Sequence, residues 1–221
     1  MVAVADTHAV ALRSAADLVS ADHVLPVAPA LSSLFPESGL VRGRVISCCG
    51  PAARSLALAI AAAAVSGGCW LAIIDLEDLP AEALAEAGVP PHRVVSVSAG
   101  SSTAEAVGAA LDGFELIIIG ARSMSEQLAR RVAQRIRSRE AVVVVVGNES
   151  RSGDLVFSTV DPIWTGIGRG TGRLVSRRVR VERSGRRTPR PITCDLHLPA
   201  TSGGPGPIEE VSAPEPRLRT V

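Results

Sequence analysis

Short, uninterrupted apolar runs alternate with helical segments through the middle of this chain. The runs read VISCC, WLAIID, VVSVS, ELIIIG and AVVVVV, and the stretches between them, such as SLALAIAAAAV, are typical of helices. A strand that is apolar at every position has to be buried on both faces, and a parallel sheet covered by helices provides that burial. We therefore expect an α/β fold with a mainly parallel sheet flanked by helices.

The pattern changes after residue 148. LVFSTV, RLVSRRVRVE and ITCDLHL have the composition of strands, with no helix between them. The last run predicts an inward face of Ile192, Cys194, Leu196 and Leu198 and an outward face of Thr193, Asp195 and His197. We expect C-terminal antiparallel strands with one exposed face. The glycine-rich WTGIGRGTG leads into a strand, which favours a hairpin connection over a dinucleotide site.

Composition divides the 221 residues into three parts. Residues 1–40 predict an amphipathic helix followed by an extended, proline-rich flanking segment, residues 41–199 the α/β domain, and residues 200–221 a disordered tail. Residues 56–74 carry no charge, but the SGG at their centre favours a helix, a glycine stop and a strand over a membrane span. Because the N-terminus shows no secretory signal, we expect a cytoplasmic protein without membrane contact.

A Gly-Pro pair joins the first apolar run to the next helix, which is where a phosphate-binding loop would stand. Such a loop needs glycines around the phosphate, a lysine, and a Ser or Thr hydroxyl for magnesium. Here Gly50 to Ser55 spans five positions where the motif needs seven, and all 23 basic residues of the chain are arginine. Arg54 could contact a phosphate, but the shortened loop cannot wrap around it. The strand ELIII ends in Gly120, where a nucleotidase has an acid.

We therefore expect no catalytic residue, and no nucleotide cofactor at the vestigial loop of Gly50, Arg54 and Ser55. The four cysteines and four histidines are dispersed without the spacing of metal ligands, so we expect no metal either.

The segment from Gly50-Pro51 through SLALAIAAAAVSGGCWLAIIDLED to LAEAGVPPHRVVSV resembles bacterial RecA. The residues from Ile74 to Glu77 match the Ile-Asp-x-Glu strand end of RecA, and Ala87-Gly88-Val89 matches the turn that follows. The resemblance places Glu77 on the catalytic glutamate, although without a phosphate loop we interpret it as a solvated strand-end acid. Little sequence separates AVVVVVGNES from the next strand, so RecA's DNA-contacting loops look shortened.

A closer resemblance is to the ImuA-type accessory proteins of mutagenic repair, in particular the mycobacterial ImuA-prime branch. It covers residues 24–198 and rests on VLPVAPALSSLFPESGLVRG, GPAARSLALAIAAA and WTGIGRGTGRLVSRRVRVERSG. The resemblance implies a degenerate RecA-like domain that acts in the SOS response to DNA damage. It also implies a Y-family-polymerase-like partner of the ImuB type and, indirectly, an error-prone polymerase, with association to the nucleoid when engaged.

An arginine-rich region lies near the C-terminus, with nine arginines and one acid, Glu182, between residues 169 and 190. It is either a basic surface for an acidic partner or DNA, or a solvated strand pair. The candidate partner- or DNA-binding residues are Trp164, Arg177, Arg178, Arg180, Arg186 and Arg187. Three functions follow as hypotheses: a non-enzymatic adaptor in translesion DNA synthesis, a weak arginine-mediated DNA-binding module, and an atypical RecA-like ATPase.

Overall fold

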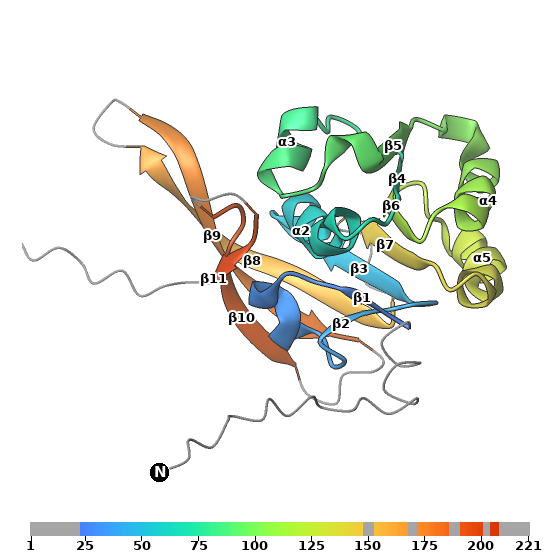
Figure 1. Ribbon diagram of the computed structural model, residues 1–221, viewed down its shortest axis with the longest axis horizontal. Coiled ribbons are helices and arrows are strands. Elements are labelled where there is room, and N and C mark those ends of the chain that lie inside the picture. The colour runs from blue at the N-terminus through green and yellow to red at the C-terminus, as the bar shows by residue number, and fades with distance from the viewer. Residues whose placement is uncertain (1–22, 148–152, 168–171, 186–190, 201–203, 208–221) are drawn as a thin grey trace, which may run out of the picture.

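The computed structural model describes residues 23–147, 153–167, 172–185, 191–200 and 204–207. These residues form one large sheet with helices on both faces, a small two-stranded sheet, and a hairpin that projects from the body (Figure 1). The helix expected near the N-terminus lies outside the described residues. In the described part of the chain, no helix is long and apolar enough to cross a membrane.

The large sheet confirms the predicted α/β fold. Neighbouring strands pair in parallel from β8 to β5, and the pairs β8–β9, β9–β10 and β10–β11 are antiparallel. In spatial order the sheet contains β11 (Gly206–Pro207), β10 (Ile192–His197), β9 (Gly172–Ser184), β8 (Leu155–Ile167), β3 (Val45–Cys49), β7 (Val142–Val146), β6 (Leu116–Gly120), β4 (Leu71–Ile74) and β5 (Val94–Val97).

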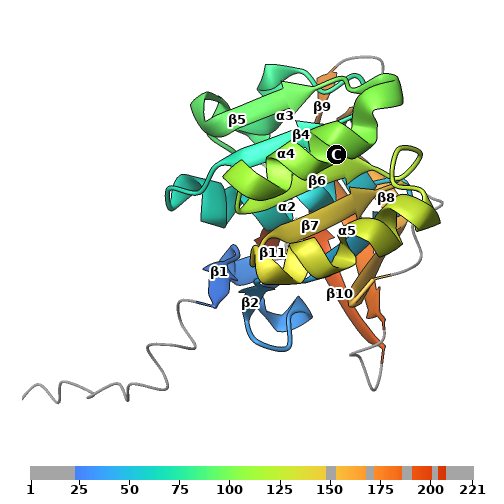
Figure 2. The same ribbon diagram turned by 90° about the vertical axis from the view of Figure 1, so that its right-hand side faces the viewer.

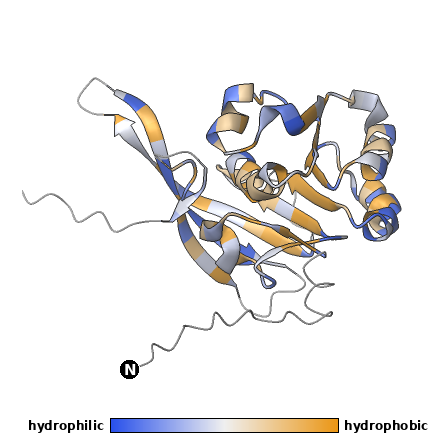
Figure 3. Cartoon of the chain, in the orientation of Figure 1, coloured by the Kyte–Doolittle hydropathy of each residue, from blue (hydrophilic) through white to orange (hydrophobic). Residues whose placement is uncertain are grey.

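Helices cover both faces because the central strands are apolar at almost every position (Figure 3). α4 (Thr103–Gly113) and α5 (Glu126–Ser138) pack on one face, which is turned toward the viewer in Figure 2. α2 (Ala53–Ser66) packs on the other face together with Leu84 of the short α3 (Ala81–Glu86). The 3-10 helix η2 (Pro91–Arg93) precedes β5, and η3 (Gly100–Ser102) leads into α4. The uncharged stretch is thus a helix, a glycine stop and a strand, as expected.

Residues 24–41 are more structured than the extended connector that the prolines suggested. β1 (Val24–Pro26) pairs with β2 (Gly39–Val41), and the 3-10 helix η1 (Pro29–Leu34) lies between them. Five large side chains of this segment are buried in the same core as α2, namely Leu25, Leu31, Leu34, Phe35 and Leu40. The segment is therefore an integral part of the core.

The C-terminal strands confirm the hairpin expected around WTGIGRGTG, but they are longer than expected. β8 and β9 have 13 residues each, because Trp164 and Ile167 continue β8 and Gly172 begins β9. We call residues 161–167 and 172–178 the arm; it projects beside α3 in Figure 1.

Two expectations for the last part of the chain are wrong. The disordered tail was expected to begin at residue 200, but Gly206–Pro207 forms β11 beside β10 because backbone bonds order this stretch. The Gly204 N–H donates to the Glu86 carbonyl at 2.6 Å, and the Ala200 N–H donates to the Gly204 carbonyl at 2.8 Å. Ile192 is exposed instead of inward, because it stands at the open end of β10. Residues 208–221 lie outside the described residues.

Candidate functional site

A cavity of about 610 Å³ opens at the carboxyl ends of the parallel strands, where ligands bind in open α/β sheets. The β3–α2 loop forms one wall, and the segments that follow β4, β6 and β7 form the others. Of the residues singled out in the sequence, Gly50, Arg54, Ser55, Glu77, Gly120 and Arg177 line it. The fold therefore brings the vestigial loop and one of the nine arginines to a single place.

The β3–α2 loop is closed against strand β8 by Thr159. The Ala52 N–H donates to Thr159 Oγ1 at 2.9 Å, and this hydroxyl donates to the Cys49 carbonyl at 3.1 Å. Gly50 has a φ of +92°, and a Cβ there would overlap the Thr159 carbonyl oxygen. A backbone N–H that a phosphate-binding loop would offer to its ligand is thus used within the protein.

Arg177 of β9 occupies the next part of the site. Its Nη2 donates to Ser55 Oγ at 2.7 Å and its Nε to the Leu198 carbonyl at 3.0 Å. Its guanidinium carbon lies 4.8 Å from the centre of the Trp164 ring, which is a cation–π distance. Arg177 is only 8% exposed, and burial lowers the pKa of its guanidinium. It is therefore not a surface arginine, and the Ser55 hydroxyl already has a protein partner.

Asp75, at the end of β4, holds the connection between β5 and α4. It accepts hydrogen bonds from Thr103 Oγ1 at 2.6 Å and from the N–H groups of Ala99 and Gly100 at 2.6 and 3.2 Å. Burial acts to raise the pKa of the Asp75 carboxyl, but these bonds outweigh it and hold the pKa below its ordinary value. Sequence reasoning missed this role; its one signal was the acid at a strand end.

Glu77 and Gly120 also line the cavity, at the positions where an active nucleotidase of this fold would carry its catalytic and metal-orienting acids. Glu77 is exposed, with no hydrogen bond or ion pair among the described residues. At Gly120 a Cβ would overlap the Asp75 carbonyl oxygen, so the close approach of the β4 end to β6 excludes any side chain there. The absence of an acid after ELIII is therefore a packing requirement of this structure.

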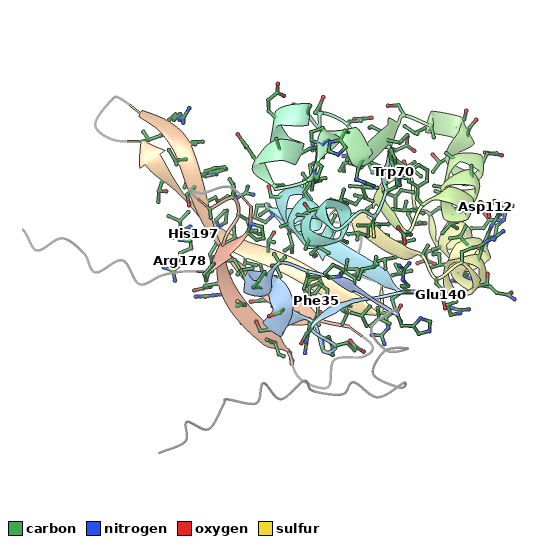
Figure 4. All side chains as sticks on the ribbon, in the orientation of Figure 1. Phe35, Trp70, Asp112, Glu140, Arg178 and His197 are labelled. Carbon is green, nitrogen blue, oxygen red and sulfur yellow. The ribbon has the colours of Figure 1, made fainter. Side chains whose placement is uncertain are left out.

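The arginines chosen from the sequence separate onto two faces of the hairpin. Arg178 (Figure 4) and Arg180 are exposed and donate to the Asp195 carboxylate at 2.8 and 3.0 Å. These two hydrogen bonds lower the pKa of Asp195. Part of the positive charge on that face is thus neutralised within the protein. Arg186 and Arg187 lie outside the described residues.

The arm carries Trp164, which was singled out from the sequence, and four further exposed apolar side chains that were not. Ile163 and Ile167 are 57% and 65% exposed, Leu174 and Val175 are 49% and 37% exposed, and Trp164 is 43% exposed. The signal was present in the adjacent pairs Ile163-Trp164 and Leu174-Val175. Neighbouring residues of a strand point to opposite faces, so each pair places one apolar side chain on each face of the hairpin.

A family model described as the MT3502 N-terminal domain matches residues 33–151, more than half of the chain. The chain belongs to the MT3502 N-terminal domain family. The part that matches the MT3502 family begins in η1 and ends after β7, so it contains the closed loop and Glu77 but not the arm. No curated protein matches the chain.

Among solved structures, this MT3502-family chain is similar to the crystal structure of the RadB recombinase. The TM-score is 0.56 and the sequence identity 15%, over 82% of this chain and 97% of that chain. A likeness at this identity shows the fold alone. It confirms that the fold is RecA-like.

Proposed function

We propose that this MT3502-family protein is a non-enzymatic adaptor of the ImuA type in damage-induced translesion DNA synthesis. It binds a Y-family-polymerase-like partner directly and an error-prone polymerase indirectly. The observation that carries the proposal is the projecting arm, whose five exposed apolar side chains have no core to cover. Apolar side chains gathered on a projecting element are typical of protein–protein interfaces, and Trp is among the residues enriched at their centres.

The closed β3–α2 loop supports the non-enzymatic part of the proposal. Thr159 Oγ1 accepts a hydrogen bond from the Ala52 N–H, and Arg177 donates one to the Ser55 hydroxyl. At Gly120 there is no room for the side chain of an acid. A nucleotide would have to displace these contacts and would find no lysine in exchange. Isothermal titration calorimetry with Mg-ATP tests whether the protein binds nucleotide. We expect no binding at millimolar concentration, and saturable binding would instead favour an atypical ATPase.

A pull-down with the purified Y-family-like partner tests the adaptor function. Ile163→Ser combined with Leu174→Ser removes two exposed apolar contacts from the arm, and we expect partner affinity to fall at least tenfold. Val95→Ser is the matched control, because Val95 is 40% exposed on the edge strand β5, away from the arm. Equal binding by the arm variant and wild type would contradict the proposal. Loss of binding in the Val95 control would mean that the effect is not specific to the arm.

DNA binding is the second candidate, because nine arginines lie between residues 169 and 190. The ion pairs of Arg178 and Arg180 with Asp195 count against it, since a phosphate would compete with that carboxylate. A titration with single-stranded DNA at two salt concentrations separates the candidates. Affinity that falls steeply with salt, and is lost in the Arg178→Ala, Arg180→Ala variant, would favour DNA over a protein partner.

A further inference from the structure

Arg177 is a buried cation whose described contacts are all uncharged. They are the Ser55 hydroxyl, the Leu198 carbonyl and the face of Trp164, and no described carboxylate lies within ion-pair distance of the guanidinium. The described residues supply acceptors for two of its five N–H groups. Removing a charge from water without a counter-ion is costly, so a buried guanidinium at a cavity wall favours binding of an anion.

The other groups at the cavity decide which kind of anion fits. Asp75 and Glu77 line the same cavity, but so do Arg54 and Arg122, so the charges of the lining other than Arg177 balance and do not select one class of anion. In the closed loop the Ala52 N–H already donates to Thr159 Oγ1, so it is not free to bind a phosphate. Without that N–H, and without a lysine in the chain, the cavity suits a single carboxylate better than a phosphate or a nucleotide.

The arm shows where such a carboxylate would come from. Val175 stands two residues before Arg177 on β9 and shares its face of the strand, and Trp164 is paired with Arg177 across the hairpin. Both side chains are partly exposed, so the cation is flanked by apolar surface. An acidic residue within an apolar protein segment complements this arrangement, and a free small acid would leave the apolar surface uncovered.

We propose that the cavity is a socket for an acidic side chain of the partner protein, which pairs with Arg177 while its apolar neighbours pack on Trp164 and Val175. The site that binds nucleotide in an active enzyme of this fold is thereby used as a protein-docking site. This proposal rests on the adaptor function and assigns that function a specific contact.

The test measures the affinity of the full-length chain for the purified Y-family-like partner. Arg177→Gln removes the charge, and we expect at least a tenfold loss of affinity; Arg177→Lys keeps the charge and should lose less. Arg93→Gln is a matched control, because Arg93 also lies over a Trp ring, that of Trp70, and donates to the Gly68 carbonyl at 2.7 Å. The control should bind within twofold of wild type.

Trp164 fluorescence gives a second readout of binding beside the cavity, and a Trp164 variant keeps the test usable if Arg177→Gln misfolds. The chain has two tryptophans, so Trp70→Phe leaves Trp164 as the single reporter beside Arg177. Its fluorescence should change on addition of the partner. Trp164→Ala, at a partly exposed position, should melt like wild type and bind at least fivefold more weakly, which keeps the test valid if Arg177→Gln does not fold.

The outcomes separate the socket from the adaptor function. If Arg177→Gln folds and binds like wild type while Ile163→Ser, Leu174→Ser does not bind, the socket is wrong and the adaptor function stands. If wild type does not bind the partner, both are wrong. If inorganic phosphate or Mg-ATP saturates the Trp164 signal below millimolar concentration in the Trp70→Phe chain but not in the same chain with Arg177→Gln, the cavity takes a free anion and the protein-docking assignment is overturned.

Discussion

At the scale of single residues, backbone geometry at the cavity decides which chemistry can occur. Gly50 lets the β3–α2 loop touch β8, and Gly120 lets the β4 end approach β6. In both places a side chain is excluded by a carbonyl oxygen. Close backbone packing therefore leaves no room for a side chain at either position.

Replacing Gly50 by Ala should destabilise the protein strongly. The change combines a left-handed φ of +92° with a Cβ that lies 2.7 Å from Thr159 Oγ1, and we expect a loss of about 2–4 kcal/mol in the free energy of unfolding. Gly68→Ala is the control, because its φ of +117° is also strained but nothing lies within 4 Å of its Cβ. It should cost about 1–2 kcal/mol. Urea denaturation measures both, and equal losses would refute close packing at Gly50.

The Asp75 carboxylate should make stability depend on pH in the acid range. Its folded pKa lies below its unfolded value of about 3.9, so its contribution is fully present above about pH 4 and is lost as pH falls through the folded pKa. Asp75→Asn should flatten this part of the profile, since Asn tolerates the φ of +49° but cannot ionise. Denaturation from pH 2 to 7 measures it, with the exposed Asp78→Asn as control. An unchanged profile in Asp75→Asn would contradict the assignment.

At the scale of elements, two segments differ from what their composition suggests. The proline-rich residues 24–41 are buried against α2 and β9, where Arg183 Nη1 donates to the Leu34 carbonyl at 2.8 Å. The arm has the sequence of a strand pair with a buried face, yet much of its apolar surface is exposed. Local composition alone therefore does not predict which of these two segments is buried and which is exposed.

Two Leu→Ala substitutions test this difference. Leu31 of η1 is fully buried, and truncating it should lower the free energy of unfolding by about 2–5 kcal/mol through lost packing and the cavity left behind. Leu174 of the arm is about half exposed, so the same change there should cost less than about 1 kcal/mol. Thermal and urea denaturation measure both. A large loss at Leu174 would show that the arm is part of the folded core.

At the scale of the whole molecule, one sheet joins the RecA-like core to the C-terminal hairpin. Val179 and Val181 of β9 share a buried cluster with α2, the central strands and residues 24–41. The hairpin base is therefore anchored in the core, while its far end projects as the arm. The proposed adaptor function would use this exposed element, held in place by an anchored base.

A shortened chain of residues 41–199 should not fold stably. It lacks all five buried side chains of the N-terminal segment and cuts into β2. Each large apolar side chain contributes about 1.5–3 kcal/mol, so the loss approaches the whole stability of a typical domain. Residues 23–207 keep every described element and should melt within a few degrees of the full chain. Circular dichroism melting compares the three. Cooperative melting of 41–199 near the full-length temperature would show that the segment is dispensable.

The sequence by itself determined the α/β class and the alternation of strands and helices, and it shows that the chain has no lysine for a phosphate-binding loop. Those conclusions depend on periodicity and on residue types within short windows, as in VVVVV for a strand buried on both faces or the absence of lysine. The hairpin at WTGIGRGTG and the exposed positions of Arg178 and Arg180 followed from the same local patterns.

Only the tertiary structure decided which distant residues meet. The contact of Arg177 with Ser55 spans 122 residues and that of Thr159 with Ala52 spans 107, and no local pattern encodes either pairing. Sequence reasoning therefore grouped Arg177 with the other arginines of its strand, although alternation places it on the opposite face, beneath Trp164. The burial of a side chain depends on what the rest of the chain packs against it, and that is a property of the folded sheet.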